Sequence, residues 1–130
     1  MTALDTRARK LAQAPNFATL SVILRSGRPM THVMWVDADE DHILINTEAH
    51  RAKFRAIERD PRVTVTVWQR DDPYTYAEVR GQVVATTRGR EARDHIDSLS
   101  RKYRGKDYDD SAITSERVIL RIAPETVRCH

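Results

Sequence analysis

The 130-residue chain has a single cysteine, Cys129, few aromatic residues and no long apolar segment. One thiol cannot close a disulfide within the chain, so disulfide scaffolds and zinc sites built from several cysteines are excluded. No apolar run approaches the roughly 20 residues that a membrane helix requires, and residues 1–11 lack the apolar core of a secretion signal. We therefore expect a cytoplasmic protein without a membrane partner.

Internal repeats and linker-like segments are also absent, because no repeat period recurs and no stretch is rich in Pro, Gly or Ser. A chain of this length, with 40% hydrophobic and 32% charged residues, predicts one domain spanning residues 1–130. The 22 Lys and Arg residues outnumber the 19 Asp and Glu residues, which gives a net charge of +3. That small excess permits an anionic partner without requiring one.

Six segments combine β-branched or alternating apolar residues with turn signals at their ends, as strands do. They are residues 17–25, 30–36, 42–47, 62–69, 74–86 and 118–123. Residues 26–29 form a tight turn between the first two strands, and the third continues the meander after a solvated acidic turn at residues 37–41. Gly81 predicts a bulge or sharp bend, and the last strand is expected to end before Pro124.

Three further segments carry apolar residues at helical spacing, which predicts short helices over residues 4–12, 49–59 and 92–103. The second helix is basic and ends before Pro61, because a residue that precedes proline is steered out of the helical region. Most of the predicted strands are neighbours joined by short turns, so the sheet should be mainly antiparallel and closed into a barrel. The predicted fold class is mainly β: a small β-barrel with flanking helices.

The stretch from Ile45 to Val63 carries the clearest chemical signal, since a polar strand end leads into the start of a basic helix. A helix N-terminus offers unpaired N–H groups and partial positive charge. With the side chains of Asn46, Thr47, Arg51 and Lys53 added, this pattern predicts a site for a phosphate or a similar anion. The alternative interpretation is that the basic side chains simply solvate the helix, and we favour it for Arg55 and Arg59.

An ordered set of short motifs carries a family resemblance that covers residues 17–127. The chain resembles the split β-barrels related to pyridoxamine-phosphate oxidase, which bind flavin mononucleotide (FMN), and especially their deazaflavin-dependent oxidoreductases of the B group. The motifs are Phe17-Ala-Thr-Leu, Gly27-Arg-Pro, Val33-Met-Trp-Val-Asp, Asn46-Thr, Arg51-Ala-Lys, Arg59-Asp-Pro-Arg-Val and Tyr76-Ala-Glu-Val-Arg-Gly.

The resemblance implies a homodimer of split barrels with a flavin-like coenzyme in each of two clefts at the subunit interface. Thr47, Arg51 and Lys53 would hold its phosphate, and its ring would lie along the second and third strands. For Met34, Trp35 and Trp68 the alternative interpretation is core packing, and for His32 a hydrogen bond in the barrel wall. The predicted cofactor-binding residues are His32, Val33, Met34, Trp35, Asn46, Thr47, Arg51, Ala52, Lys53 and Trp68.

The resemblance further implies an oxidoreductase that transfers hydride from the reduced deazaflavin coenzyme F(420) to an unsaturated small-molecule substrate. FMN oxidases of this kind usually carry an Arg and a Lys on the second strand, and residues 30–36 contain neither, which favours F(420) over FMN. An FMN-dependent oxidoreductase and a non-enzymatic flavin-, deazaflavin- or haem-binding protein stay as alternatives.

Some chemistry is left open or excluded by the sequence. His32, Tyr76 and Tyr103 are possible proton donors, but none is assigned a catalytic role. Substrate specificity is expected in the loops at residues 69–73 and 101–110. We expect no metal site, and no nucleic-acid partner, because acidic residues interrupt the basic segment and no aromatic stripe accompanies it.

Overall fold

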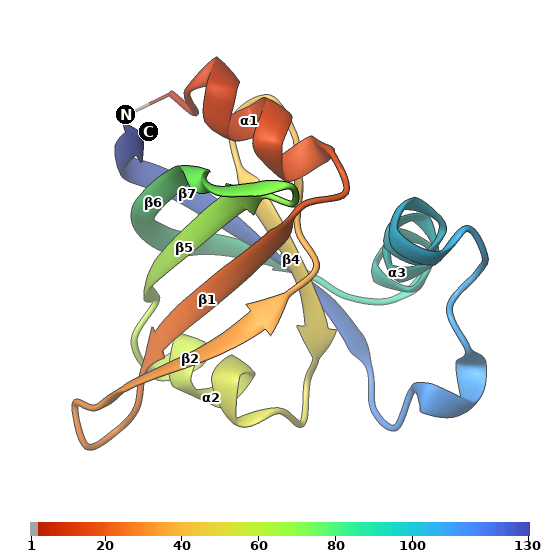
Figure 1. The fold of residues 1–130 in the computed structure, drawn as a ribbon. Coiled ribbons are helices and arrows are strands. Elements are labelled where there is room, and N and C mark those ends of the chain that lie inside the picture. The colour runs from red at the N-terminus through yellow and green to blue at the C-terminus, as the bar shows by residue number, and fades with distance from the viewer. Residues whose placement is uncertain (1–2) are drawn as a thin grey trace.

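The computed structural model describes residues 3–130, in which one curled antiparallel sheet of seven strands forms most of the molecule (Figure 1). The strand order across the sheet is β2-β1-β5-β6-β7-β4-β3. The prediction of a mainly β barrel with flanking helices is confirmed. The strands are β1 (Phe17–Ile23), β2 (Pro29–Met34), β3 (Asp37–Ala38), β4 (Ile43–Glu48), β5 (Arg62–Gln69), β6 (Asp72–Thr87) and β7 (Arg117–Cys129).

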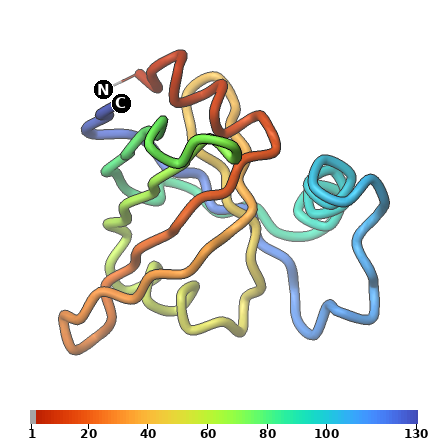
Figure 2. Tube along the Cα trace, in the orientation of Figure 1, coloured from red at the N-terminus to blue at the C-terminus, as the bar shows by residue number. Residues whose placement is uncertain are grey.

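Alternating burial explains how these strands enclose a core. In β1 and β5 every second residue is buried, and the buried valines of β5 face the interior beside Leu20 of β1. The interior is lined largely by β-branched side chains, which pack well on a pleated surface. Two short helices cover the open ends: α1 (Thr6–Gln13) crosses one end of the curled sheet and α2 (Ala52–Arg59) the other (Figures 1 and 2).

The predicted irregularity at Gly81 is confirmed, because the pairing of β6 with β7 shifts register between Arg80 and Gly81. A Cβ atom at Gly81 would lie 2.1 Å from the backbone oxygen of Ala123, so only glycine allows this approach. The shift lets β7 continue through Pro124 to Cys129, and the prediction that this strand ends before Pro124 is wrong. Proline lacks an N–H donor, and the irregular pairing accommodates that loss.

The predicted meander is also wrong for its third strand. β4 pairs with β7 and β3 and lies on the opposite side of the sheet order from β2. All six residues of β4 are buried: Ile43 and Ile45 belong to the barrel core, whereas Leu44 packs on the other side with Ala92 of α3 (Arg90–Arg104). A strand with two buried faces needs cover on both, and α3 supplies the outer cover.

Smaller corrections concern element ends. β2 stops at Met34 rather than at residue 36, and α2 begins at Ala52 rather than at residue 49. The predicted acidic turn contains the short strand β3, whose first residue, Asp37, is half-buried because His95 of α3 contacts it. A single 3₁₀ turn, η1 (Asp110–Ala112), follows α3. Within residues 3–130, no helix combines the length and the apolar character needed to cross a membrane.

Candidate functional site

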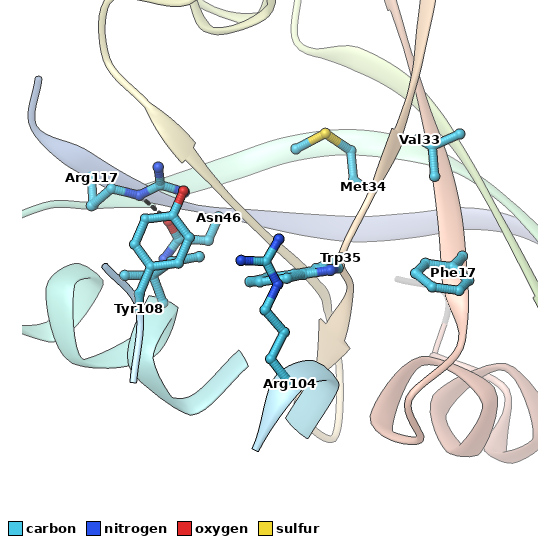
Figure 3. Close-up of a pocket in the computed structure, with 9 residues that line it drawn as sticks. Phe17, Val33, Met34, Trp35, Asn46, Arg104, Tyr108 and Arg117 are labelled. Carbon is cyan, nitrogen blue, oxygen red and sulfur yellow. Dashed lines mark hydrogen bonds between the residues drawn. The ribbon is translucent and has the colours of Figure 1, made fainter. Parts of the chain in front are cut away.

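A cleft of about 300 Å³ opens where the end of β2 meets β4, β7 and the C-terminal part of α3 (Figure 3). Its walls are mainly apolar and aromatic, with a few polar groups that converge on it, which is the composition of small-molecule sites. The segments that form it are distant in the sequence. The lining residues are Phe17, Val33, Met34, Trp35, Asn46, Ile96, Arg104, Tyr108 and Arg117.

The aromatic wall of the cleft is built around Trp35. Its ring stacks on Tyr103 with 5.1 Å between centroids and 5° between planes, and Tyr108 meets it edge-on at 6.2 Å. The Arg104 guanidinium lies 5.1 Å from the centre of the Trp35 ring (Figure 3). These contacts fix the Trp35 indole in place and put positive charge beside an aromatic wall.

Tyr103 fixes this wall to the barrel. Its hydroxyl accepts a hydrogen bond from the Val36 backbone N–H at 3.1 Å and donates one to the backbone oxygen of Asn16. Burial raises the pKa of the Tyr103 hydroxyl above its ordinary value. Lys102, the preceding residue, donates to the backbone oxygens of Ala12 and Val36, at 3.1 and 2.5 Å. The end of α3 is therefore tied to the segments that flank β1 and β2.

Behind Met34, next to the lining of the cleft, lies a buried cation, Lys53. The Lys53 side chain is buried, with 8% exposure, and its Nζ lies 3.3 Å from the sulfur of Met34. Burial, together with the charges of Arg51 and Arg117, lowers the pKa of Lys53. Among residues 3–130, no carboxylate lies within ion-pair distance of Lys53. A buried ammonium without a counter-ion is costly, and a bound anion would remove that cost.

Helix α2 adds positive charge beside Lys53. Arg51 is its N-cap residue, and Ala52 and Lys53 form the first turn, which contains no acidic residue. The N-terminal N–H groups of a helix carry partial positive charge that favours anions. This arrangement agrees with the predicted grouping of Arg51 and Lys53.

Arg117, the first residue of β7, is a second buried cation and was not among the predicted site residues. Its Nε donates to Asn46 Oδ1 at 2.9 Å (Figure 3). Its Nη1 lies 3.5 Å from Glu48 Oε1. Burial opposes ionisation of Glu48, but hydrogen bonds from the Thr114 backbone N–H and hydroxyl and the Arg117 charge outweigh it, so the Glu48 pKa is lowered. The pair is thus a fixed ionic support at the base of the cleft.

The structure brings several predicted residues to one place. Val33, Met34, Trp35 and Asn46 all line the cleft, and Lys53 reaches it through its contact with Met34.

Other predicted residues lie outside the lining. His32 is exposed on β2, and Trp68 packs beside Phe17 with 6.4 Å between ring centroids. Thr47 is buried in β4, and Arg51 and Ala52 are exposed at the start of α2.

Sequence reasoning missed five lining residues as individual residues: Phe17, Ile96, Arg104, Tyr108 and Arg117. Arg104 and Tyr108 fall inside the loop region 101–110 in which specificity was expected, but their side chains gave no signal of their own. Arg117 precedes the apolar run of β7 and resembles an ordinary charged flank of a strand. Only the pairing of β7 with β4, which sets Arg117 opposite Glu48, reveals its position.

The matching family model spans almost the whole chain. The model described as pyridoxamine 5'-phosphate oxidase matches residues 4–130. The chain belongs to this family. The pyridoxamine 5'-phosphate oxidase family includes oxidoreductases, and proteins with its fold bind flavin-type cofactors. No curated protein matches the chain.

Several solved structures have the same fold as this chain. An F(420) reductase is similar with a TM-score of 0.83 and 26% identity, over 96% of this chain and 98% of that one. A conserved hypothetical protein from Mycobacterium tuberculosis has a TM-score of 0.70 and 24% identity, covering 98% and 83% of the two chains. General Stress Protein 26 from Bacillus anthracis has a TM-score of 0.64 and 20% identity, covering 93% and 88%. These neighbours show that the cleft belongs to a split barrel.

The cleft fits the cofactor class of the family. A flavin-type cofactor joins a flat, largely apolar ring to an anionic phosphate. The stacked Trp35 wall suits the ring, and buried Lys53, without a carboxylate partner, suits the phosphate. Among residues 3–130 there is no group of three or more His, Cys, Asp or Glu side chains that could hold a metal ion.

Proposed function

We propose that this protein is an F(420)-dependent oxidoreductase that transfers hydride from the reduced deazaflavin to an unsaturated small molecule. The observation that carries this proposal is Lys53, a buried cation without a carboxylate partner beside an aromatic cleft. Such a site favours a ligand that combines a planar ring with a phosphate.

Two features favour F(420) over FMN. Strand β2 carries no Arg or Lys between Pro29 and Met34, so the cations of the cleft come from α2, β7 and the end of α3. The F(420) reductase among the similar structures aligns over nearly the full length of both chains. FMN remains the second candidate, because the family as a whole is that of pyridoxamine 5'-phosphate oxidase.

The residues of the chain bind and orient rather than react. Lys53, Arg51 and the supported guanidinium of Arg117 would hold the phosphate. Met34 and Trp35 would contact the ring, with Tyr108 closing one side. When bound, the reduced deazaflavin supplies the hydride. The protein then contributes a fixed ring position and a largely apolar surface against which a substrate can lie.

None of the possible proton donors is assigned that role. The hydroxyl of Tyr103 is engaged by the backbone of Val36 and Asn16, and Tyr76 stacks on His130 with 4.6 Å between ring centroids. His32 is exposed on β2 and does not line the cleft. Hydride transfer of this kind does not require an acid–base pair supplied by the protein.

The active form is proposed to be a homodimer. Strand β2 is an edge strand that pairs only with β1, and its Val33 is 64% exposed while it lines the cleft. A strand at the edge of a sheet presents unpaired backbone N–H and C=O groups that can pair with another chain. A second copy placed against β2 would cover the mouth of the cleft and complete the cofactor site.

A fluorescence titration tests the cofactor assignment. In a Trp68→Phe background the signal comes from Trp35 alone, and F(420) and FMN are added separately. We expect quenching by F(420) at lower concentration than by FMN. We expect Lys53→Ala to weaken binding at least about tenfold, because it removes a charge-assisted contact, and Arg55→Ala, on the exposed face of α2, to leave it unchanged.

The outcomes separate the proposal from its alternatives. Tighter binding of FMN would identify a flavoprotein, and binding of F(420) without oxidation of its reduced form by any unsaturated acceptor would identify a carrier. The site assignment is wrong if neither ligand quenches Trp35 or if Lys53→Ala binds as the parent protein does.

A further inference from the structure

Arg117 is held at the base of the cleft by a chain of polar contacts that reaches α3 and β3. The Arg117 Nε–H donates to Asn46 Oδ1 at 2.9 Å. Asn46 Nδ2 lies 3.0 Å from the backbone oxygen of Ala92 and 3.1 Å from Nδ1 of His95. His95 Nε2, in turn, lies 3.2 Å from Asp37 Oδ2.

In this hydrogen-bonded network, the donor or acceptor role of each group determines the role of the next. An arginine Nε can only donate, and a backbone oxygen can only accept, so two independent partners orient the Asn46 amide. Its NH₂ group is therefore a donor toward His95, whose Nδ1 must accept. The imidazole proton then resides on Nε2, where it donates to Asp37. This assignment comes from the hydrogen-bond partners of the ring.

The surroundings keep this arrangement stable. Asn46 and Arg117 are both buried, and the His95 side chain is only 10% exposed. Burial opposes ionisation of Asp37, but the hydrogen bonds from His95 and from the Ala38 backbone N–H, with the nearby charge of Lys102, lower its pKa. In a buried network a donor that meets a donor is costly, because neither group can turn to water.

We infer that His95 is a positioning residue that orients the guanidinium of Arg117, through Asn46, at the anion-binding end of the cleft. The inference rests on the proposed function for its consequence in ligand binding, but its geometry stands in the ligand-free protein. If His95 Nδ1 carried a proton, two hydrogen-bond donors, this N–H and the Asn46 NH₂ group, would face each other. A reversed Asn46 amide would then oppose both Arg117 Nε–H and the Ala92 oxygen.

Three charged groups lie around the His95 imidazole. Asp37 faces the imidazole from β3, Lys102 acts on Asp37 from α3, and Arg117 lies beyond Asn46 on β7. The inference predicts weaker anion binding whenever both ring nitrogens of His95 carry a proton. A variant that cannot be protonated at this position should not show that change.

Two variants separate the halves of the network. His95→Asn keeps an acceptor near the place of Nδ1 but loses the contact with Asp37. His95→Gln places its amide near Nε2 and removes the acceptor for Asn46. In ¹⁵N-labelled full-length protein, we expect slow hydrogen exchange of the Arg117 Nε–H in the parent and in His95→Asn. In His95→Gln we expect exchange to be about tenfold faster. Asp94→Asn, one residue earlier and exposed, is the control.

Spectroscopy and affinity then give independent results. Imidazole ¹⁵N shifts of the parent protein at neutral pH should show the proton on Nε2 of His95. FMN and F(420) should bind about three- to tenfold more weakly to His95→Gln than to His95→Asn, and acidification should weaken the parent but not His95→Asn.

A proton found on Nδ1, or equal Arg117 exchange in the two variants, would overturn the inference even if ligand binding is intact. If the parent binds neither ligand but the exchange pattern is as expected, the proposed function fails and the positioning role of His95 stands.

Discussion

At the scale of single residues, Lys53 shows a conflict between stability and function. Its buried ammonium has no carboxylate partner in the described chain and contacts only the thioether of Met34 among hydrogen-bond partners. Replacing a buried, poorly compensated charge by an apolar side chain of similar length is often stabilising. The unliganded protein therefore carries a cost that a bound anion would offset.

The substitution Lys53→Met tests this conflict. We expect the unliganded variant to be more stable by about 1 kcal/mol, or roughly 3–6 °C in Tm. We also expect it to lose most of its affinity for FMN and F(420). Calorimetry and titration measure the two effects, with Arg55→Met as the exposed control on the same helix. A variant that is less stable and still binds would contradict the account of Lys53 as an anion ligand.

Glu48 predicts how stability depends on pH. Its folded-state pKa lies below the unfolded value, despite burial, because Thr114 and Arg117 favour the ionised form. The folded state therefore holds its proton less tightly, so the stabilisation is present above the unfolded pKa and is lost as pH falls through the folded one. In urea unfolding between pH 7 and pH 3, Glu48→Gln should lose less stability on acidification than the parent, whereas Glu40→Gln, at an exposed position, should follow the parent.

At the scale of elements, regular amphipathic segments were predictable and segments buried on two sides were not. β1 and β5 alternate cleanly, so their sequence indicates both strand and inner face. β4 contains Asn46, Thr47 and Glu48 and looks half-solvated in the sequence, yet all three are buried, with α3 covering Asn46 and Thr114 contacting Glu48. Pairing partners depend on such cover, which local periodicity does not encode.

Gly81 sits at the register shift in the pairing of β6 with β7. In Gly81→Ala the added Cβ would stand 2.1 Å from a backbone oxygen, and a backbone neighbour cannot move aside cheaply. We expect a loss of about 2–4 kcal/mol in the free energy of unfolding. Thr86→Ala, at an exposed position of the same strand, is the control. Equal denaturation midpoints for the two variants would refute the close approach at Gly81.

Tyr103 controls the docking of α3. Tyr103→Phe keeps the stack on Trp35 but leaves the Val36 N–H and the Asn16 oxygen without their partner. We expect a cost of about 1–3 kcal/mol and faster hydrogen exchange in α3 than in β5. Tyr74→Phe, at a position that is 85% exposed, should change neither quantity. Uniform exchange changes across the molecule would argue against a local role for Tyr103.

At the scale of the whole molecule, the proposed dimer makes a prediction about mass. The parent protein should elute with twice the mass of its 15.0 kDa chain in light-scattering chromatography. Val33→Asp should shift it to a monomer and weaken cofactor binding, because the edge of β2 would then repel its copy. Val84→Asp alters another exposed valine, on β6, and should remain dimeric. If the parent protein is monomeric at all accessible concentrations, the proposed dimer interface is wrong.

Some residues of the candidate site are neighbours in the sequence, whereas others come together only in the folded molecule. Asn46, Arg51 and Lys53 lie close together along the chain, so their shared chemistry was apparent. Arg104 and Arg117 come from the end of one helix and the start of a distant strand, and the docking of α3 together with the pairing of β7 brings them to the cleft. Trp68 gave no signal in the sequence that separates packing from cofactor contact, and in the structure it lies beside Phe17, which lines the cleft.

The different environments of the amines have a practical consequence for chemical labelling. The chain has four lysines: Lys10 and Lys106 are exposed, Lys102 donates to two backbone oxygens, and Lys53 lies buried at the cleft with a lowered pKa. A less basic amine is more often uncharged and hence nucleophilic, so a small acylating reagent that enters the cleft should modify Lys53. A bound phosphate should protect it while Lys10 and Lys106 continue to react. Mass-spectrometric footprinting would thus report occupancy of the cleft without any turnover assay.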